Sequence, residues 1–205
     1  MAFSDYKHIA QVQQEYQITY REQHFLVAQP QEPSPQFLDE FAFNLENIDV
    51  YTSEGARSEM IICPILREVY KHYYQNYALW IQKSIAYDER LTGTPDYMIA
   101  KRSELGKTVF EFPMIIAVEA KQNDFTKGWG QCAAELVAAQ RLNAESMRPV
   151  YGIVSDGKLW EFGRLRESHF IKESEGFTVD HLGLLFGVLD MLFHAATAGQ
   201  DLCFP

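Results

Sequence analysis

The stretch TPDYMIAKRSELGKTVFEFPMIIAVEAKQ, residues 94–122, decides the fold. Its run Met114–Val118 is continuously apolar, which is typical of a central strand that is covered on both faces. Residues 95–102 are predicted to form a preceding strand, and Gly106 marks a turn between the two segments. We therefore expect a hairpin whose second strand lies in the middle of a sheet.

Three charged side chains lie within or at the end of this apolar stretch. Glu119 and Lys121 are two residues apart, so they share one face of a strand, and the hairpin would bring Asp96 beside Glu119. Charged groups are rarely buried without a partner, and two converging carboxylates repel unless a cation lies between them. Mg²⁺, a hard ion that prefers oxygen ligands, is the cation we expect. Lys121 would orient or activate a water molecule, or hold a phosphate.

Apolar spacing and capping residues predict the other elements. We expect Ser4, Ser34 and Ser58 to cap helices, Pro35 to occupy a first helical position, and Pro64 to restart or kink its helix. Residues 51–57 are predicted to form a turn, and Asp156-Gly157 a type I′ hairpin turn. The expected helices are 4–25, 34–48, 58–75, 124–143 and 178–197, the expected strands are 77–89, 95–102 and 113–122, and the expected hairpin is 148–165.

This order of elements predicts an α/β fold: a mixed central sheet with helices on both faces. We expect one domain over residues 1–205, because 205 residues can bury one substantial core. Within it, residues 1–57 would be a helical extension and residues 58–166 the core. Residues 167–205 would carry a helix that packs on the core or on a partner, for example in a homodimer.

Composition and charge limit the classes of function. The formal net charge is -10, yet fourteen of the eighteen basic residues lie in residues 61–168, which leaves a nucleic-acid surface open there. The three cysteines are far apart and suggest a reduced, cytoplasmic setting. The start of the chain has no apolar leader segment. The C-terminal apolar run contains Asp190 and His194, so we expect a buried helix and no membrane span.

Pro95-Asp96 followed by Glu119-Ala120-Lys121 resembles the PD-(D/E)xK nuclease superfamily, which has a restriction endonuclease-like fold. The family's core order of helix, three strands, helix and strand is similar to the order expected for residues 58–155. SEMIICPIL and NDFTKGWGQCA look similar to the nuclease domain of type I restriction enzyme subunits and its stand-alone relatives. The resemblance covers about half of the chain.

The resemblance implies a role for each matching residue. Asp96, Glu119 and the backbone carbonyl of Ala120 would bind Mg²⁺ or Mn²⁺, and Lys121 would position the attacking water. Glu59, on the first core helix, would bind a second ion or tune the ligands of the first. Gln131 would contact the phosphate backbone or support the site. The implied partner is nucleic acid, and we expect DNA.

Each residue also has a simpler interpretation. Asp96 could be a turn residue after Pro95, and Glu119 with Lys121 an ion pair at a strand end. Glu59 could be an acid that the helix dipole favours, and Gln131 a polar residue at a helix start. Glu135, one turn beyond Gln131, is expected to be solvated.

Three functions compete at this stage. The first is a metal-dependent nuclease that hydrolyses phosphodiester bonds, and the intact Asp96, Glu119 and Lys121 set favours it. The second is a catalytically inactive protein of the same fold that binds nucleic acid or serves in assembly, which the acidic balance and the apolar C-terminal helix favour. The third is a metal-binding hydrolase of small phosphate esters.

Overall fold

The computed structural model describes residues 2–202 and has the predicted α/β architecture. An eight-stranded mixed sheet has the strand order β1-β9-β8-β7-β6-β5-β2, with β10 paired to β8. The pairs β6–β7 and β1–β9 are parallel and the other pairs of this sheet are antiparallel. The strands are β1 (Thr19–Gln23), β2 (Tyr77–Ile81), β5 (Tyr97–Arg102), β6 (Phe110–Ala120), β7 (Val150–Ser155), β8 (Leu159–Arg166), β9 (His169–Glu173) and β10 (Phe177–Thr178).

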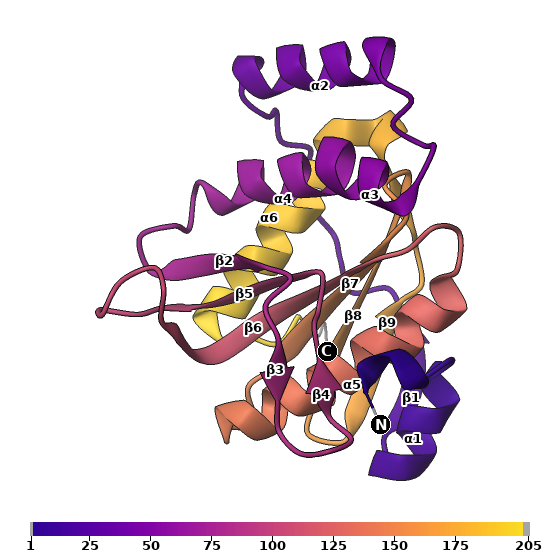
Figure 1. Cartoon of the computed structure of the whole chain (residues 1–205), viewed down its shortest axis with the longest axis vertical. Helices are drawn as coiled ribbons and strands as arrows, with labels where there is room; N and C mark the ends of the chain where they lie inside the picture. Colours follow the sequence, from indigo (N-terminus) through magenta and orange to yellow (C-terminus); the bar gives the residue numbers. More distant parts are fainter. Residues whose placement is uncertain (1, 203–205) are drawn as a thin grey trace.

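Helices cover both faces of the sheet (Figure 1). On one face α5 packs over the middle of the sheet with α1 beside it near β1, and on the other face lie α4 and α6, with α2 stacked outside them. The helices are α1 (Ile9–Tyr16), α2 (Pro35–Asn47), α3 (Glu54–Arg57), α4 (Cys63–Tyr70), α5 (Phe125–Asn143) and α6 (Leu182–Ala198), with short 3₁₀ turns at Phe3–Asp5 and Val179–His181.

The central strand β6 is buried on both faces, as its apolar run predicts. Residues from Met114 to Val118 are at most 1% exposed. Ile116 and Val118 face the core on the α6 side, whereas Met114 and Ala117 face the core under α5. The predicted caps of α2 are also confirmed, because Ser34 Oγ accepts a hydrogen bond from Phe37 N at 3.2 Å and Pro35 is the first helical residue.

The predicted helix over residues 4–25 is wrong in its second half. The 3₁₀ turn contains Ser4, the helix α1 begins only after His8, and it ends at Gln17, which has a left-handed backbone with φ 55°. Residues 19–23 then form β1, which pairs in parallel with β9. Strands β9 and β10 were not predicted at all. Both pair with β8, which precedes them in the chain, whereas the partner of β1 lies far away in the sequence, so local periodicity carries no signal for the β1–β9 pairing.

The helix that carries Glu59 starts earlier than predicted. Ser53, and not Ser58, is its cap: Ser53 Oγ accepts from Ala56 N at 3.1 Å, so most of the predicted turn over residues 51–57 is helical. The α3 helix continues through a π-helical segment, Ser58–Ile62, into α4. Pro64 cannot donate a backbone hydrogen bond, and the wider π turn directly before it accommodates that loss without ending the helix.

Two further predictions need correction. Residues 77–89 are not one strand: after β2 the chain forms a separate two-stranded hairpin of β3 (Ile85–Ala86) and β4 (Thr92–Gly93). The turn between β7 and β8 is not type I′, because Gly157 has positive φ but Asp156 and Lys158 do not. The Asp156 carboxylate instead accepts from the backbone N–H groups of Lys158 and Leu159 at 2.9 and 2.8 Å.

The C-terminal helix α6 packs in the core. Leu185, Leu189, Leu192 and Phe193 are fully buried against the sheet and α4. Among the described residues, Val179–Ala198 is the one helix long and apolar enough to cross a membrane, and half of it is buried inside the protein. A core helix meets the same criterion of length and hydropathy. The expectation of packing on the core is therefore confirmed, and a partner interface stays a prediction.

The N-terminal segment packs closely on α5 at Gly130. A Cβ atom there would lie 2.6 Å from Tyr6 O and 2.7 Å from His8 N, both backbone atoms. We expect Gly130→Ala to lower the free energy of unfolding by about 1–3 kcal/mol in urea titrations, because the backbone has to move. The control is Gly183→Ala in α6, whose Cβ would meet nothing closer than 3.5 Å. Equal stability of the two variants would contradict this docking.

Candidate active site

Asp96 and Glu119 lie opposite each other at one end of the β5–β6 hairpin. The register pairs Tyr97 with Val118, so one step further along the strands places Asp96 across from Glu119. The backbone N–H of Ala120 donates to Asp96 Oδ2 at 2.8 Å and fixes the orientation of that carboxylate. The Glu119 side chain is 2% exposed and the Asp96 side chain 26% exposed. The predicted neighbourhood of these two carboxylates is therefore present.

Lys121 joins the two carboxylates. Its Nζ lies 2.7 Å from Glu119 Oε2 and 3.8 Å from Asp96 Oδ2. Its backbone N–H donates to Ser155 O at 2.8 Å, which ties the end of β6 to the end of β7. The structure thus brings together the three residues that the sequence singles out, at the end of a buried central strand.

Burial and mutual repulsion shape the electrostatics of this cluster. Burial raises the pKa of Asp96 to about 6, and the neighbouring charge of Glu119 adds to the rise, while Lys121 and the Ala120 N–H oppose it. Burial works to lower the pKa of Lys121, but the charges of Glu119 and Asp96 outweigh it, so the pKa is raised and Lys121 stays an ammonium ion. Two carboxylates and one ammonium leave the cluster with a negative excess near neutral pH.

Glu135, which we expected to be solvated, is fully buried under α5. No group of the described residues donates to its carboxyl oxygens, and the neighbouring Glu119 is the acceptor to which a protonated Glu135 can donate. Burial and the adjacent charge of Glu119 raise its pKa well above the usual range, so the side chain is held in the neutral form. The expectation fails because α5 packs against the sheet along its length, and the face that carries Glu135 points inward.

Gln131 lies on the same stripe of α5 as Glu135. Gly128 starts this stripe, and a Cβ atom on Gly128 would come within 3.1 Å of Lys121 Cγ, so the first turn of α5 sits directly against the lysine. Residues three, four and seven positions on lie on the same helical face. Gln131 is half-buried between these two points, and its side chain has no hydrogen-bond partner among the described residues.

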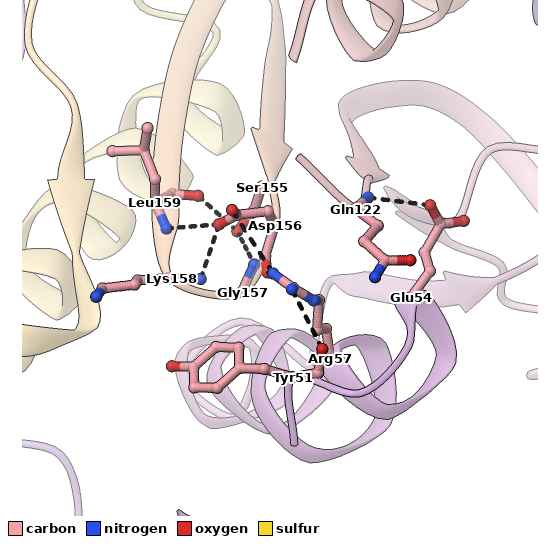
Figure 2. A network of polar contacts seen from close by, with 9 residues as sticks. All are labelled: Tyr51, Glu54, Arg57, Gln122, Ser155, Asp156, Gly157, Lys158 and Leu159. Carbon is pink, nitrogen blue, oxygen red and sulfur yellow. Dashed lines mark hydrogen bonds and ion pairs between the residues drawn. The ribbon is translucent and has the colours of Figure 1, made fainter. Parts of the chain in front are cut away.

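Glu59 does not contact the cluster in the structure, whereas Glu54, which the sequence did not single out, lies close enough to act on it. Glu59 is exposed on the π-helical segment, which the Tyr97 hydroxyl anchors by donating to Ser58 O at 3.1 Å. Glu54 Oε2 accepts from Gln122 N at 3.2 Å (Figure 2). The charge of Glu54 acts on both Asp96 and Lys121. Sequence reasoning missed Glu54 because it started the helix at Ser58; choosing Ser53 as the cap would have found it.

Arg57 links α3 to the β7–β8 turn beside the cluster. Its guanidinium, 8% exposed as a residue, donates to Asp156 O at 2.9 Å and to Tyr51 O at 3.2 Å. It also lies 3.7 Å from Asp156 Oδ2 and over the Tyr51 ring. Figure 2 shows the side chain reaching from α3 to the β7–β8 turn. Because Ser155 precedes this turn and holds Lys121 N, Arg57 fixes the wall of the site.

The described residues of the cluster do not form a complete, preformed metal-binding site. Within residues 2–202, no three His, Cys, Asp or Glu side chains converge in the way that a preformed metal centre needs. What the site offers is two carboxylates beside the Ala120 backbone, with a lysine between them.

Comparisons with family models, curated proteins and solved structures found no match to this chain. The chemistry of the site therefore has to be inferred from its own residues.

Glu135→Gln tests the buried neutral carboxyl. The folded protein keeps the Glu135 proton at pH values where the unfolded chain, with a pKa near 4.5, has lost it. The wild type therefore loses stability as the pH rises above that value, whereas an amide does not titrate. We expect the gain in Tm of Glu135→Gln over the wild type to grow between pH 4 and pH 7, measured with a chelator present.

The matched control is Glu46→Gln, an exposed acid on α2. Its difference from the wild type should stay within about 0.5 kcal/mol across the same range. A Glu135→Gln difference that does not change with pH would contradict a neutral Glu135.

Proposed function

We propose that the chain is a metal-dependent nuclease of the PD-(D/E)xK type that hydrolyses phosphodiester bonds in DNA. The observation that carries the proposal is the convergence of Asp96, Glu119 and Lys121 at the end of β6, with the lysine Nζ within 3.8 Å of both carboxylates. Perturbed ionisable groups held together at a strand end are typical of catalytic sites.

The donor set suits a hard divalent cation. The two carboxylates supply more negative charge than Lys121 neutralises, and burial raises the pKa of Asp96, which a bound cation would reverse. Asp96, Glu119 and the backbone carbonyl of Ala120 would hold Mg²⁺ or Mn²⁺. Glu54, rather than Glu59, is the acid of the α3–α4 helix whose charge already acts on the cluster. When bound, the ion would polarise the phosphodiester and make a water molecule more acidic.

The chain's own residues have separable tasks. Lys121, held by Glu119 at 2.7 Å, would orient the water and stabilise the negative charge that develops on the phosphate oxygens. The Ala120 N–H keeps the Asp96 carboxylate turned toward the lysine. Gln131, half-buried on the adjacent helical turn, would donate to the phosphate backbone.

One observation favours a catalytically inactive protein of the same fold as the second candidate. The Lys121 ammonium already pairs with both carboxylates, and the described residues form no preformed metal group. In such a protein the cluster would be a buried ion-pair network that stabilises the strand end, and the surface would serve nucleic-acid binding or assembly.

The test compares the wild type with Asp96→Asn and Lys121→Met on single- and double-stranded DNA and RNA. Each substrate is incubated with Mg²⁺, with Mn²⁺ and with a chelator. We expect metal-dependent cleavage of DNA, and a loss of about 100-fold or more in rate for either variant, because each removes a charge from the reacting centre.

Asp39→Asn, which removes an exposed acid on α2, is the control and should cleave like the wild type. Hydrolysis of a small phosphate ester with intact nucleic acid would favour a small-molecule hydrolase. No cleavage of any substrate by folded wild-type protein, together with unchanged metal binding in Asp96→Asn, would contradict the nuclease and support the inactive protein.

A further inference from the structure

The far side of the sheet carries a group of basic side chains that the proposed function does not use. The register of β1, β9 and β8 forms two neighbouring rows. Because residues two apart on a strand point the same way, both rows lie on one face, the face of α6. The first row is Thr19, His169 and Arg166, and the second is Arg21, Ile171 and Arg164.

These side chains line a cavity of about 280 Å³ that we name the arginine pocket. Its polar lining residues are Thr19, Arg21, Arg164, Arg166, His169 and the two acids Glu167 and Asp201. The chain carries a formal net charge of -10, yet three guanidinium groups outnumber the carboxylates around this one cavity. Glu119 on β6 pairs with Val154 on β7, and Val154 pairs with Glu161 on β8, so these three side chains lie on one face of the sheet. Arg164 is three residues beyond Glu161 on β8 and therefore points to the opposite face, where the pocket lies.

The C-terminal tail already places one carboxylate in this pocket. Asp201 pairs with the buried Arg164, and its Oδ2 lies 2.8 Å from Arg166 Nη1. The tail is held there by the Tyr151 hydroxyl, which donates to Gln200 O at 2.7 Å. The chain itself therefore demonstrates that an oxyanion fits between the two arginines.

Donors remain beside Asp201. Arg21 is exposed at the sheet edge, and its guanidinium makes no ion pair or hydrogen bond with any residue from 2 to 202. Arg166 Nε is buried and meets no acceptor among the described residues. Asp201 pairs with both Arg164 and Arg166, so the tail accounts for those two guanidinium groups, and the guanidinium of Arg21 is left beside the open cavity together with the unpaired Arg166 Nε. The arrangement matches the recognition of phosphate by the planar donors of arginine.

We propose that the arginine pocket binds a phosphate group, as free phosphate or as the phosphate of a mononucleotide. Arg21 and Arg166 donate to its oxygens, and the phosphate competes with Asp201 for Arg166. This site is independent of the nuclease proposal, because it shares no residue with the Asp96, Glu119 and Lys121 cluster.

The experiment titrates the wild type with inorganic phosphate and, separately, with adenosine monophosphate by isothermal titration calorimetry. Chloride at matched ionic strength and a chelator are present, so that screening and metal binding do not contribute. We expect Arg21→Gln to weaken phosphate binding about tenfold, as for the loss of one charge-assisted hydrogen bond. Asp201→Asn should strengthen binding by a similar factor because it removes the competing carboxylate.

Lys158→Gln is the matched control, since it removes the same unit of charge from an exposed position on the β7–β8 turn. It should bind phosphate like the wild type. Tighter binding of the mononucleotide than of free phosphate would identify a nucleotide as the source of the phosphate, and equal or weaker binding would identify the free ion. No saturable phosphate binding by the wild type, or equal effects of Arg21→Gln and Lys158→Gln, would overturn the proposal.

Discussion

The structure depends on the burial of β6 on both of its faces. Residues from Met114 to Val118 fill two cores at once, one under α5 and one under α6. The run itself carries no charge, so the charged side chains lie on either side of it, at Glu111 before the run and at Glu119 and Lys121 after it. The neighbouring strands are fixed by their pairing with β6, and this pairing brings Asp96 and Ser155 to the same end of the sheet. The candidate site is thus a consequence of how the central strand is packed.

Charge balance at that strand end limits what the cluster can do. Glu119 and Asp96 share one ammonium ion, and Glu135 is accommodated beneath them only as a neutral acid. A group of this kind costs folding free energy, because buried carboxylates repel each other and lose their hydration. Proteins keep such costly arrangements where a ligand relieves them, and a divalent cation with a phosphate oxygen would relieve this one. In the arginine pocket on the opposite face, the positive charges are in excess, and the chain's own Asp201 carboxylate pairs with two of the guanidinium groups.

Local signals in the sequence were sufficient for part of this picture. The apolar run of β6, the Ser34-Pro35 cap of α2 and the two-residue spacing of Glu119 and Lys121 each act over a few residues, and each could be predicted. Strand β1 could not, because TYREQ is a polar edge strand whose partner begins at His169. The burial of Glu135 depends on how α5 lies on the sheet, although the surrounding alanines are a signal of close packing. Glu54 was missed through one misplaced helix cap.

The most direct test of the central claim is to locate Mn²⁺, which scatters anomalously, in crystals of the wild-type protein soaked with the ion. We predict an anomalous peak about 2 Å from carboxylate oxygens of both Asp96 and Glu119, with Lys121 Nζ moved away from its position 2.7 Å from Glu119. Peaks only elsewhere, or no peak while the lysine keeps its contact with Glu119, would contradict a metal site at the end of β6. The cluster would then be an ion-pair network that serves the fold.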